Sequence, residues 1–465
     1  MTNFHQIQQR RTFLGQSCRG LGAMALASLF QRAEAAPGVV AKPHVKPKAK
    51  RVIFLVMAGG PSHLELYDNK PVLAKNDGQP MPDSITKGQP IAQLQGAKLT
   101  CLGPQWGFKK HGKSGIEMNE LFTHLPTVAD DLCMIRSMKT EAINHDPAHT
   151  FMNSGSSVSG RPSMGSWITY GLGSETEDLP GFVVLTSSRG GQMQPIASRQ
   201  WSAGFLPGKF QGVHLRGQGD PVLYLTNPPG VDREKQKDVI DAVSQLNQLQ
   251  NGVVDDPEIA TRISQYELAF KMQASVPALM DISQEPKAVL DSYGVKGSDG
   301  SFGANCLLAR RLAQKGVRFI QLYNRDWDHH GGVKDGIKQK IAEIDQPCAA
   351  LIKDLKRLGM FEDTLIVCTG EFGRTPMSQG GSGRDHHMKG FSLWMAGGGI
   401  KGGVTHGATD DFGYHAAENV VEVFDLHATM LHLMGVDHER LTFRFQGRDY
   451  RLTDVHGKIV KPILA

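Results

Sequence analysis

Short runs of apolar residues alternate with longer segments of helical periodicity along most of the chain. Residues 52–57 are all apolar and are closed by a Gly-Gly-Pro turn, a pattern typical of a strand buried on both faces. Similar runs occupy 181–185, 317–323, 365–368 and 391–395, and helical periodicity is clear at 336–358 and 420–434. Strands that alternate with helices predict a doubly wound, mostly parallel α/β sheet with helices on both faces.

The pattern changes between residues 186 and 300. Loops rich in Gly, Pro and Gln are followed there by two long polar helices, expected at 233–251 and 257–272. We interpret 186–300 as a cap or insertion within one α/β domain that covers 51–465. That length suffices for one large domain with insertions or for two smaller ones.

The first 50 residues have a different character. Arg10 and Arg11 precede Phe-Leu, an uncharged stretch covers 21–30, and an Ala-Glu-Ala site ends at Ala35. This order predicts a twin-arginine-type signal peptide at 1–35, with a membrane anchor as the alternative. Residues 36–50, rich in Pro, Lys and Ala, predict a flexible linker. We therefore expect export of the folded protein by the twin-arginine machinery to the periplasm or the extracellular space, with residual membrane attachment left open.

Charge and cysteine content exclude two classes of function. Residues 1–35 carry four of the 51 basic and one of the 46 acidic residues, so the remaining chain has a formal net charge of +2. Such a balance offers no nucleic-acid footprint. Five cysteines follow residue 35 without a Cys-x-x-Cys pair, which argues against a disulfide framework and a zinc ribbon. The sequence does not specify an oligomeric state.

Acidic and imidazole side chains follow successive strands of the predicted sheet. Asp328 and His330 come after the run 317–323, Glu371 follows 365–368, and His386 lies in a further glycine-bearing turn. Because the carboxyl ends of parallel strands meet at one edge of a sheet, these groups are expected to form one metal site. Asp326 is an alternative to Asp328. His387 is likewise an alternative to His386.

Several motifs resemble a known family. They are GGPSH (59–63), RPSMGSW (161–167), GEFGRTP (370–376), GGGIKGG (397–403) and a closing segment from Asp425 to Gly435. Together with the twin-arginine start, they are similar to the exported domain-of-unknown-function 1501 family of the alkaline phosphatase and sulfatase superfamily. The resemblance covers almost the entire chain and implies an alkaline-phosphatase-like fold, with metal ions held by Asp and His at strand ends.

The resemblance carries over residue by residue, with departures. Glu371 stands where relatives have the Asp of an Asp-His pair, and Phe372 replaces the His. His63 substitutes for an Asp that relatives place after the first strand. His145 aligns with the nucleophile. The implied cofactor is one or two divalent metal ions, with zinc or manganese favoured and calcium as an alternative. The implied metal ligands are His63, His145, Asp328, His330, Glu371 and His386.

Two mechanisms remain open. Metal-bound water can attack the ester directly, which needs no protein nucleophile. Alternatively a hydroxyl at a helix start, Ser163 or Ser154, can be the nucleophile. The catalytic candidates are His145 and two arginines, Arg374 and Arg384. Each arginine can either clamp an oxyanion or be the structural partner of a strand-end carboxylate. Further candidate site residues are Ser62, His149, Ser163, Asp326, His329, Asp385, His387 and Lys389.

The sequence thus predicts an exported, metal-dependent hydrolase of phosphate or sulfate esters. A sulfated or phosphorylated polysaccharide is the expected kind of substrate. The alternative is a catalytically silent relative that serves as a binding or cell-surface assembly protein, and the missing Asp, Phe372 and the missing nucleophile favour that alternative.

Overall fold

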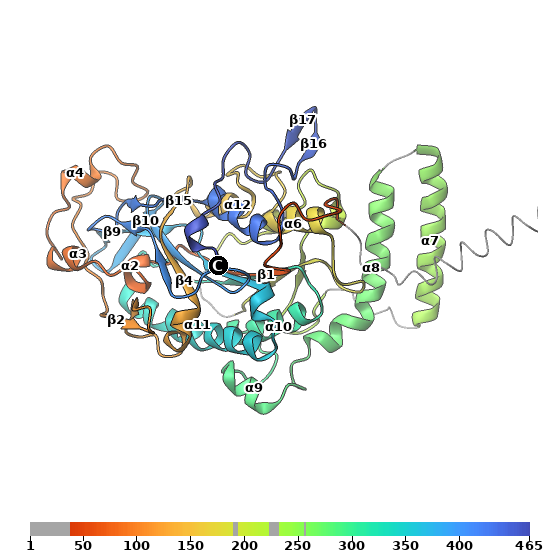
Figure 1. Ribbon diagram of the computed structural model, residues 1–465, viewed down its shortest axis with the longest axis horizontal. Helices are drawn as coiled ribbons and strands as arrows, with labels where there is room; N and C mark the ends of the chain where they lie inside the picture. Colours follow the sequence, from red (N-terminus) through yellow and green to blue (C-terminus); the bar gives the residue numbers. More distant parts are fainter. Residues whose placement is uncertain (1–37, 189–193, 223–231, 255–256) are drawn as a thin grey trace, which may run out of the picture.

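A nine-stranded sheet organises the computed structural model, which describes residues 38–465 except 189–193, 223–231 and 255–256 (Figure 1). The strand order is β12-β4-β11-β8-β1-β7-β5-β6, and β15 also pairs with β4. The strands are β1 (Arg51–Met57), β4 (Leu132–Lys139), β5 (Phe182–Thr186), β6 (Val213–Leu215), β7 (Phe319–Asn324), β8 (Thr364–Thr369), β11 (Phe391–Ala396), β12 (Val404–His406) and β15 (Val421–Glu422).

The sheet is mostly parallel. β1 pairs in parallel with β7 on one side and with β8 on the other, and β5 is parallel to β7 and β6. β11 runs antiparallel to both β4 and β8. All five predicted strands are present, whereas β4 escaped prediction because Arg136 and Lys139 interrupt its apolar pattern. The mostly parallel sheet is confirmed, with β11 as its antiparallel member.

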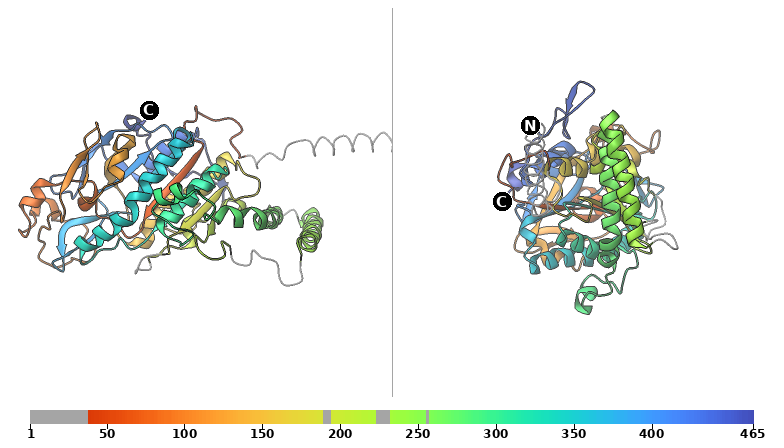
Figure 2. Two further views of the ribbon diagram at one scale, coloured as in Figure 1. Left: turned by 90° about the horizontal axis from the view of Figure 1, so that it is seen from below. Right: turned by 90° about the vertical axis from the view of Figure 1, so that its right-hand side faces the viewer.

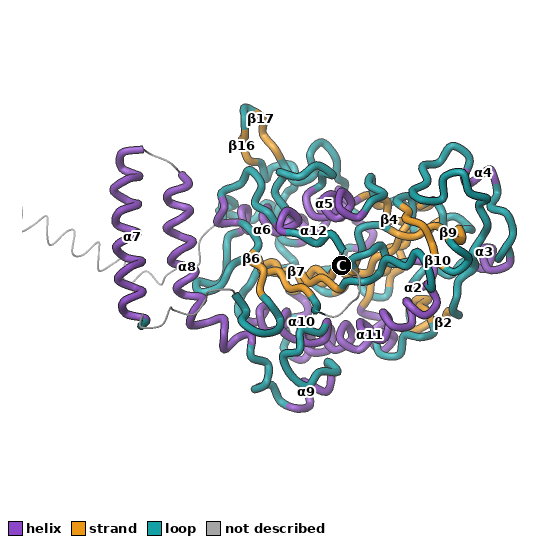
Figure 3. Tube along the Cα trace, turned by 180° about the vertical axis from the view of Figure 1, so that it is seen from behind, coloured by secondary structure: helices purple, strands orange, loops and turns teal. Residues whose placement is uncertain are grey.

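Helices cover both faces of the sheet (Figures 1 and 3). In β1, Ile53 and Leu55 belong to one core cluster, and Val52 and Phe54 belong to the other, because successive side chains of a strand point to opposite faces. α10 (Phe302–Gln314) and α11 (Val333–Arg357) pack into the first core. α5 (His145–Ser154), α6 (Met164–Leu172) and α12 (Val423–Leu433) pack into the second. The predicted doubly wound arrangement is confirmed.

Two long helices extend from one end of the sheet (Figures 1 and 2). They are α7 (Arg233–Val254) and α8 (Pro257–Met280), as the polar helical pattern predicted. Met272, Val276 and Leu279 of α8 join the core. Val239 and Leu246 of α7 are exposed. The range 186–300 is not all outside the sheet, because β6 lies within it and pairs with β5.

The described part of the segment before β1, residues 38–50, makes backbone hydrogen bonds to the ends of two helices. The backbone N–H groups of Val39 and Val40 donate to the end of α6, and those of Lys48 and Ala49 donate to Leu433 at the end of α12. These donors bond to carbonyl groups in the last turns of the helices, which have no partner within the helix. The predicted signal peptide at 1–35 lies outside the described residues.

Shorter elements complete the structure. Among the described residues, no helix is both long and apolar enough to cross a membrane. The remaining helices and strands are α2 (His63–Leu66), α3 (Pro71–Lys75), α4 (Asp83–Thr86), α9 (Lys287–Ser292), β2 (Phe108–His111), β3 (Ile116–Asn119), β9 (Gly373–Gln379), β10 (Gly383–His387), β13 (Ala408–Thr409), β14 (Ala416–Glu418), β16 (Phe443–Phe445) and β17 (Arg448–Tyr450).

A buried histidine in α12 makes stability depend on pH. His427 is fully buried with its Nε2 2.8 Å from the Met152 carbonyl oxygen, and burial lowers its pKa to about 4 from an ordinary 6.5. The unfolded chain therefore takes up the proton first as the pH falls. We expect His427→Gln to remove roughly 2 to 3 kcal/mol of the stability loss between about pH 7 and pH 4. Urea unfolding of both proteins at the two pH values measures this, and equal losses would contradict it.

Candidate metal centre

The site lies where the carboxyl ends of three neighbouring strands meet. β1 is hydrogen-bonded to β7 and β8, so the loops that follow β7 and β8 emerge on either side of the turn after β1. The β7 loop carries Asp328 and His330, and the β8 loop carries Glu371. His145 is the first residue of α5, and His386 lies on β10. Parallel pairing thus gathers residues that are far apart in sequence.

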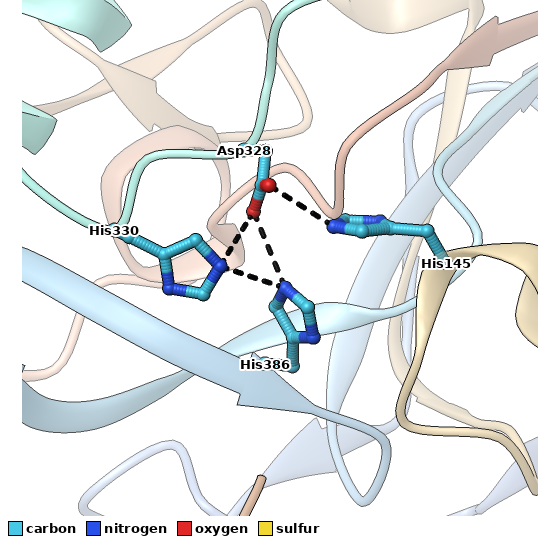
Figure 4. A group of neighbouring side chains, drawn as sticks. All are labelled: His145, Asp328, His330 and His386. Atoms are coloured by element: carbon cyan, nitrogen blue, oxygen red, sulfur yellow. Dashed lines mark hydrogen bonds and ion pairs between the residues drawn. The ribbon is translucent and has the colours of Figure 1, made fainter. Parts of the chain in front are cut away.

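Three imidazoles and one carboxylate converge in this site (Figure 4). One ligand-type atom from each of His145, Asp328, His330 and His386 lies within 4.8 Å of all the others. Asp328 Oδ1 lies 3.0 Å from His330 Nε2 and 3.2 Å from His386 Nε2, and Asp328 Oδ2 lies 3.2 Å from His145 Nε2. The two nitrogens His330 Nε2 and His386 Nε2 are 2.9 Å apart. This is a candidate metal-binding cluster.

Hydrogen bonds on the far side of each ring leave the Nε2 atoms facing the centre. His386 Nδ1 donates to the Ile143 carbonyl oxygen at 2.9 Å, and His330 Nδ1 lies 2.6 Å from Gln379 Oε1. A neutral imidazole whose Nδ1 carries the proton has a lone pair on Nε2. Such outer hydrogen bonds fix the tautomer of metal-binding histidines.

A second group of side chains lies behind His145. His145 Nδ1 is 2.6 Å from Glu371 Oε1, and His149 Nε2 is 3.4 Å from the same oxygen. The Glu371 carboxylate also accepts from the backbone N–H of Gly59 at 3.0 Å. Glu371 and His149 are completely buried. Glu371 therefore orients His145 in the manner of a carboxylate behind a metal-binding histidine, and the same three side chains form a second candidate cluster.

Electrostatic interactions shift the pKa values of this site strongly. Burial opposes the charge on His145, but its contacts with Asp328 and Glu371 outweigh burial and raise its pKa to about 9. Burial likewise opposes the Glu371 charge, yet the two neighbouring histidines hold its pKa at about 2. Asp328 has its pKa lowered, because hydrogen bonds from the histidines outweigh its burial. Burial lowers the pKa of His386. Both carboxylates are therefore anionic at neutral pH.

Arg374 ties the metal-site carboxylate to the turn after β1. Its guanidinium hydrogen bonds to Asp328 Oδ1 and to the carbonyl oxygens of Gly59 and Gly60, with the Nε contact to Gly60 at 2.8 Å. Arg374 is 1% exposed. Its donors are thus directed to protein acceptors, and Arg374 is the partner of a strand-end carboxylate, one of the two roles that the sequence left open.

The donor set fits a divalent cation. His330 Nε2 and His386 Nε2 face each other at 2.9 Å beside an ionised carboxylate oxygen. Lone pairs in such proximity repel unless a cation lies among them, and lowering of the His386 pKa disfavours a proton there. Imidazole nitrogens with a carboxylate oxygen are a ligand set that zinc and similar ions bind.

Two predicted ligands or clamps lie elsewhere. Arg384 is completely buried and binds Glu65, with Nη2 2.6 Å from Oε1, so it is an internal ion pair instead of an oxyanion clamp. His63 bonds through Nε2 to the Gly413 carbonyl oxygen at 2.9 Å and is not part of either cluster among the described residues. Ser62 bonds to Glu65.

The remaining candidates have structural contacts of their own. His387 Nε2 lies 2.5 Å from the Tyr414 carbonyl oxygen, and burial lowers its pKa to about 3. Asp385 accepts backbone N–H groups from residues 93 and 94. His329 is half-buried beside Gly336, and desolvation lowers its pKa to about 4. Asp326 has a left-handed φ of 74°, and Lys389 is half-buried. None of the residues His387, Asp385, His329, Asp326 and Lys389 belongs to the two clusters found among the described residues.

The candidate hydroxyl nucleophiles are also engaged elsewhere. Ser163 precedes α6 and bonds to Ser166 at 2.9 Å, and Ser154 donates to the Thr150 carbonyl oxygen at 2.7 Å. The start of α5 presents His145 instead of a hydroxyl. Neither hydroxyl is therefore directed to the candidate metal centre.

Two residues that orient the histidines of the site were not predicted from the sequence. Gln379 fixes His330, but an isolated glutamine in a strand gives no signal. Phe372, seen as a lost ligand, packs its ring 4.9 Å from that of His145 and 4.8 Å from that of His386. A buried aromatic beside two histidines limits their rotation, and only its place next to Glu371 hinted at this role.

The structure is thus that of an α/β protein with a candidate metal site at its strand ends. A family profile described as "Protein of unknown function (DUF1501)" matches residues 49–464. The chain therefore belongs to the DUF1501 family. No curated protein matches its sequence.

Similar solved structures include hydrolases at low identity. The PsFucS1 sulfatase from Pseudoalteromonas sp. is 10% identical, over 84% of this chain and 69% of that chain, with a TM-score of 0.35. The phosphonate monoester hydrolase SpPMH from Silicibacter pomeroyi is 12% identical, over 73% and 71%, with a TM-score of 0.34. A TAB5 alkaline phosphatase mutant with Mg bound in its M3 site is 11% identical, over 76% and 92%, with a TM-score of 0.28.

The turn after β1 requires glycine at position 59. Gly59 has a φ of +123°, and a Cβ there would lie 2.6 Å from the Asp328 backbone nitrogen. We expect Gly59→Ala to lower the free energy of unfolding by roughly 2 kcal/mol or more, because strain and overlap add. Gly78→Ala is the matched control, since Gly78 also has a positive φ but has nothing within 4 Å of its Cβ position. Denaturant unfolding should show a clearly smaller loss for the control, and equal losses would refute the steric argument.

Proposed function

We propose that this protein is an exported metal-dependent hydrolase of phosphate or sulfate esters, acting by attack of water and not through a protein nucleophile. The observation that supports this most is the convergence of three histidine Nε2 atoms and one carboxylate, each oriented by an outer partner. The motifs shared with the alkaline phosphatase and sulfatase superfamily indicate the ester class.

His145, Asp328, His330 and His386 would hold the ion. When bound, a divalent ion would supply Lewis-acid polarisation of the ester and lower the pKa of water. The protein's own contribution is to fix the donors. Glu371 holds the Nδ1 proton of His145, and Arg374 holds Asp328. Zinc or manganese is the proposed metal, because imidazoles dominate the set.

The proposal also covers the kind of substrate and the location of the protein. Exposure is highest at His330, whose side chain is 26% exposed, while that of His386 is 5% exposed. The ester would therefore approach from the side of His330. We propose a sulfated or phosphorylated polysaccharide outside the cytoplasm as the substrate, after export by the twin-arginine machinery.

Metal binding should depend on the carboxylate behind His145. We expect Glu371→Gln to weaken zinc or manganese binding roughly 10- to 100-fold, because the outer partner of a metal-binding histidine is replaced by a neutral group. The exposed Glu362→Gln is the control. Competition with a chromophoric chelator measures the affinity, and an unchanged affinity in Glu371→Gln would show that Glu371 does not support the site.

Activity should require the ion and its ligands. Metal-loaded protein is expected to hydrolyse aryl phosphates or aryl sulfates, and His386→Ala is expected to lose about 100-fold or more of that rate because a metal ligand is removed. Removal of the ion by a chelator and its return should abolish and restore turnover. The exposed His124→Ala should keep full activity.

Metal binding without ester hydrolysis would favour the alternative function, that of a catalytically silent relative. Protein that binds about one ion per chain yet turns over no phosphate or sulfate ester would support the binding or assembly role. Purified protein that binds no divalent ion would refute the metal centre itself.

A further inference from the structure

An irregular segment between α4 and β2 reaches the candidate metal centre. Gln93 lies on this segment with an exposed side chain. Its backbone N–H donates to Asp385 Oδ2 at 2.7 Å, and that of Leu94 donates to the same oxygen at 3.0 Å. Asp385 directly precedes the candidate ligand His386. The segment is thus anchored to the strand that carries one of the ligands.

Three side chains at this rim form a closed ring of contacts. His330 Nδ1 lies 2.6 Å from Gln379 Oε1, Gln379 Nε2 donates to Gln93 Oε1 at 2.9 Å, and Gln93 Nε2 lies 3.4 Å from His330 Nε2. The carbonyl oxygen of Gln93 is therefore held by Gln379, and its amide nitrogen is directed to the atom of His330 that faces the centre.

Metal binding would change what this amide nitrogen contacts. If His330 held a cation, its Nε2 lone pair would no longer be available to the Gln93 side-chain N–H groups that now face it. The side-chain oxygen of Gln93 would still accept from Gln379, so the amide would stay at the rim with an N–H donor available. A neutral amide there attracts an oxyanion by hydrogen bonding.

The arginines do not fill this role. The predicted oxyanion clamps, Arg374 and Arg384, are buried and directed to protein acceptors: the first to Asp328 and backbone carbonyls, the second to Glu65 and further backbone carbonyls. A donor to an anion at the metal must come from another side chain. Gln93 is exposed and adjacent to His330, the most exposed of the candidate ligands that are histidines.

We infer that Gln93 binds the tetrahedral oxyanion of the ester, donating its Nε2 hydrogen to an oxygen of the phosphate or sulfate group. This inference rests on the proposed function and names a substrate-binding residue within it. Gln379 and Asp385 act as positioning residues: the first holds the Gln93 side chain, and the second holds its backbone.

The test compares anion binding by metal-loaded variants. Inorganic phosphate and sulfate are titrated calorimetrically into zinc-loaded wild type, Gln93→Ala, Gln93→Glu and Gln95→Ala. Gln95 is the matched control, because it is an exposed glutamine two residues away whose Nε2 donates to the Ile91 carbonyl oxygen. We expect about 10-fold weaker phosphate binding for Gln93→Ala, from the loss of one hydrogen bond to a charged group. A larger loss is expected for Gln93→Glu, because its carboxylate repels the anion, and no change for Gln95→Ala.

Bound zinc, measured in each variant, separates this inference from the proposed function. Full zinc occupancy with weakened anion binding in the Gln93 variants alone supports the inference. If wild type binds phosphate and Gln93→Ala binds it equally well, the role of Gln93 is refuted while the metal centre stands. If Gln93→Ala loses zinc, Gln93 supports the ligands and the inference is wrong. If zinc-loaded wild type binds neither anion, the proposed function fails and the inference fails with it.

Discussion

The parallel pairing of β1 with both β7 and β8 is the constraint on which the rest of the site depends. It places the end of β1 between the loops that carry Asp328 and Glu371. The Gly59 turn then connects them: its backbone N–H binds Glu371, and its carbonyl oxygen binds Arg374, which in turn holds Asp328. Backbone groups at a strand end thus position both carboxylates.

The charges of the site explain why an anion would bind there. Asp328 and Glu371 are both ionised, since their pKa values are lowered, and Arg374 supplies one positive charge. His145, whose pKa is raised to about 9, balances the remaining charge when protonated. A divalent ion with neutral histidines would leave one net positive charge among these groups. In a partly buried site that excess would attract an anion, such as the phosphate or sulfate ester proposed above, more strongly than it would in water.

Sequence pattern was sufficient for the central strands of the sheet but not for side-chain partners. Mainly apolar runs identified β1, β7 and β8, because strands buried on both faces contain few polar residues. The direction of β11 was not predictable, since an apolar run carries no information on orientation. β10 was expected as a turn, because Gly383 and its polar residues hide a strand that pairs with β9.

The same distinction between strand position and tertiary contacts applies to the residues of the candidate site. Strand position indicated Asp328 and His330, which follow a central strand, but left Asp326 open as an alternative to Asp328. The sequence leaves the role of Arg384 open between an oxyanion clamp and a carboxylate partner. Its partner Glu65 is more than 300 residues away in sequence, and no local pattern links the two. Gln93 gave no signal, because its role depends on contacts with His330 and Gln379 that only the tertiary structure creates.

Burial alone does not distinguish the metal centre from the other histidines. His63, His387 and His427 are also buried, and burial lowers the pKa of each. Each of them bonds through Nε2 to a backbone carbonyl oxygen, which uses the proton on that nitrogen. In His330 and His386 the outer bond is made by Nδ1, so the two Nε2 lone pairs meet each other and the Asp328 carboxylate. Gln379 and the Ile143 carbonyl group thus orient the Nε2 lone pairs of His330 and His386 toward each other. A cation between them would relieve their repulsion.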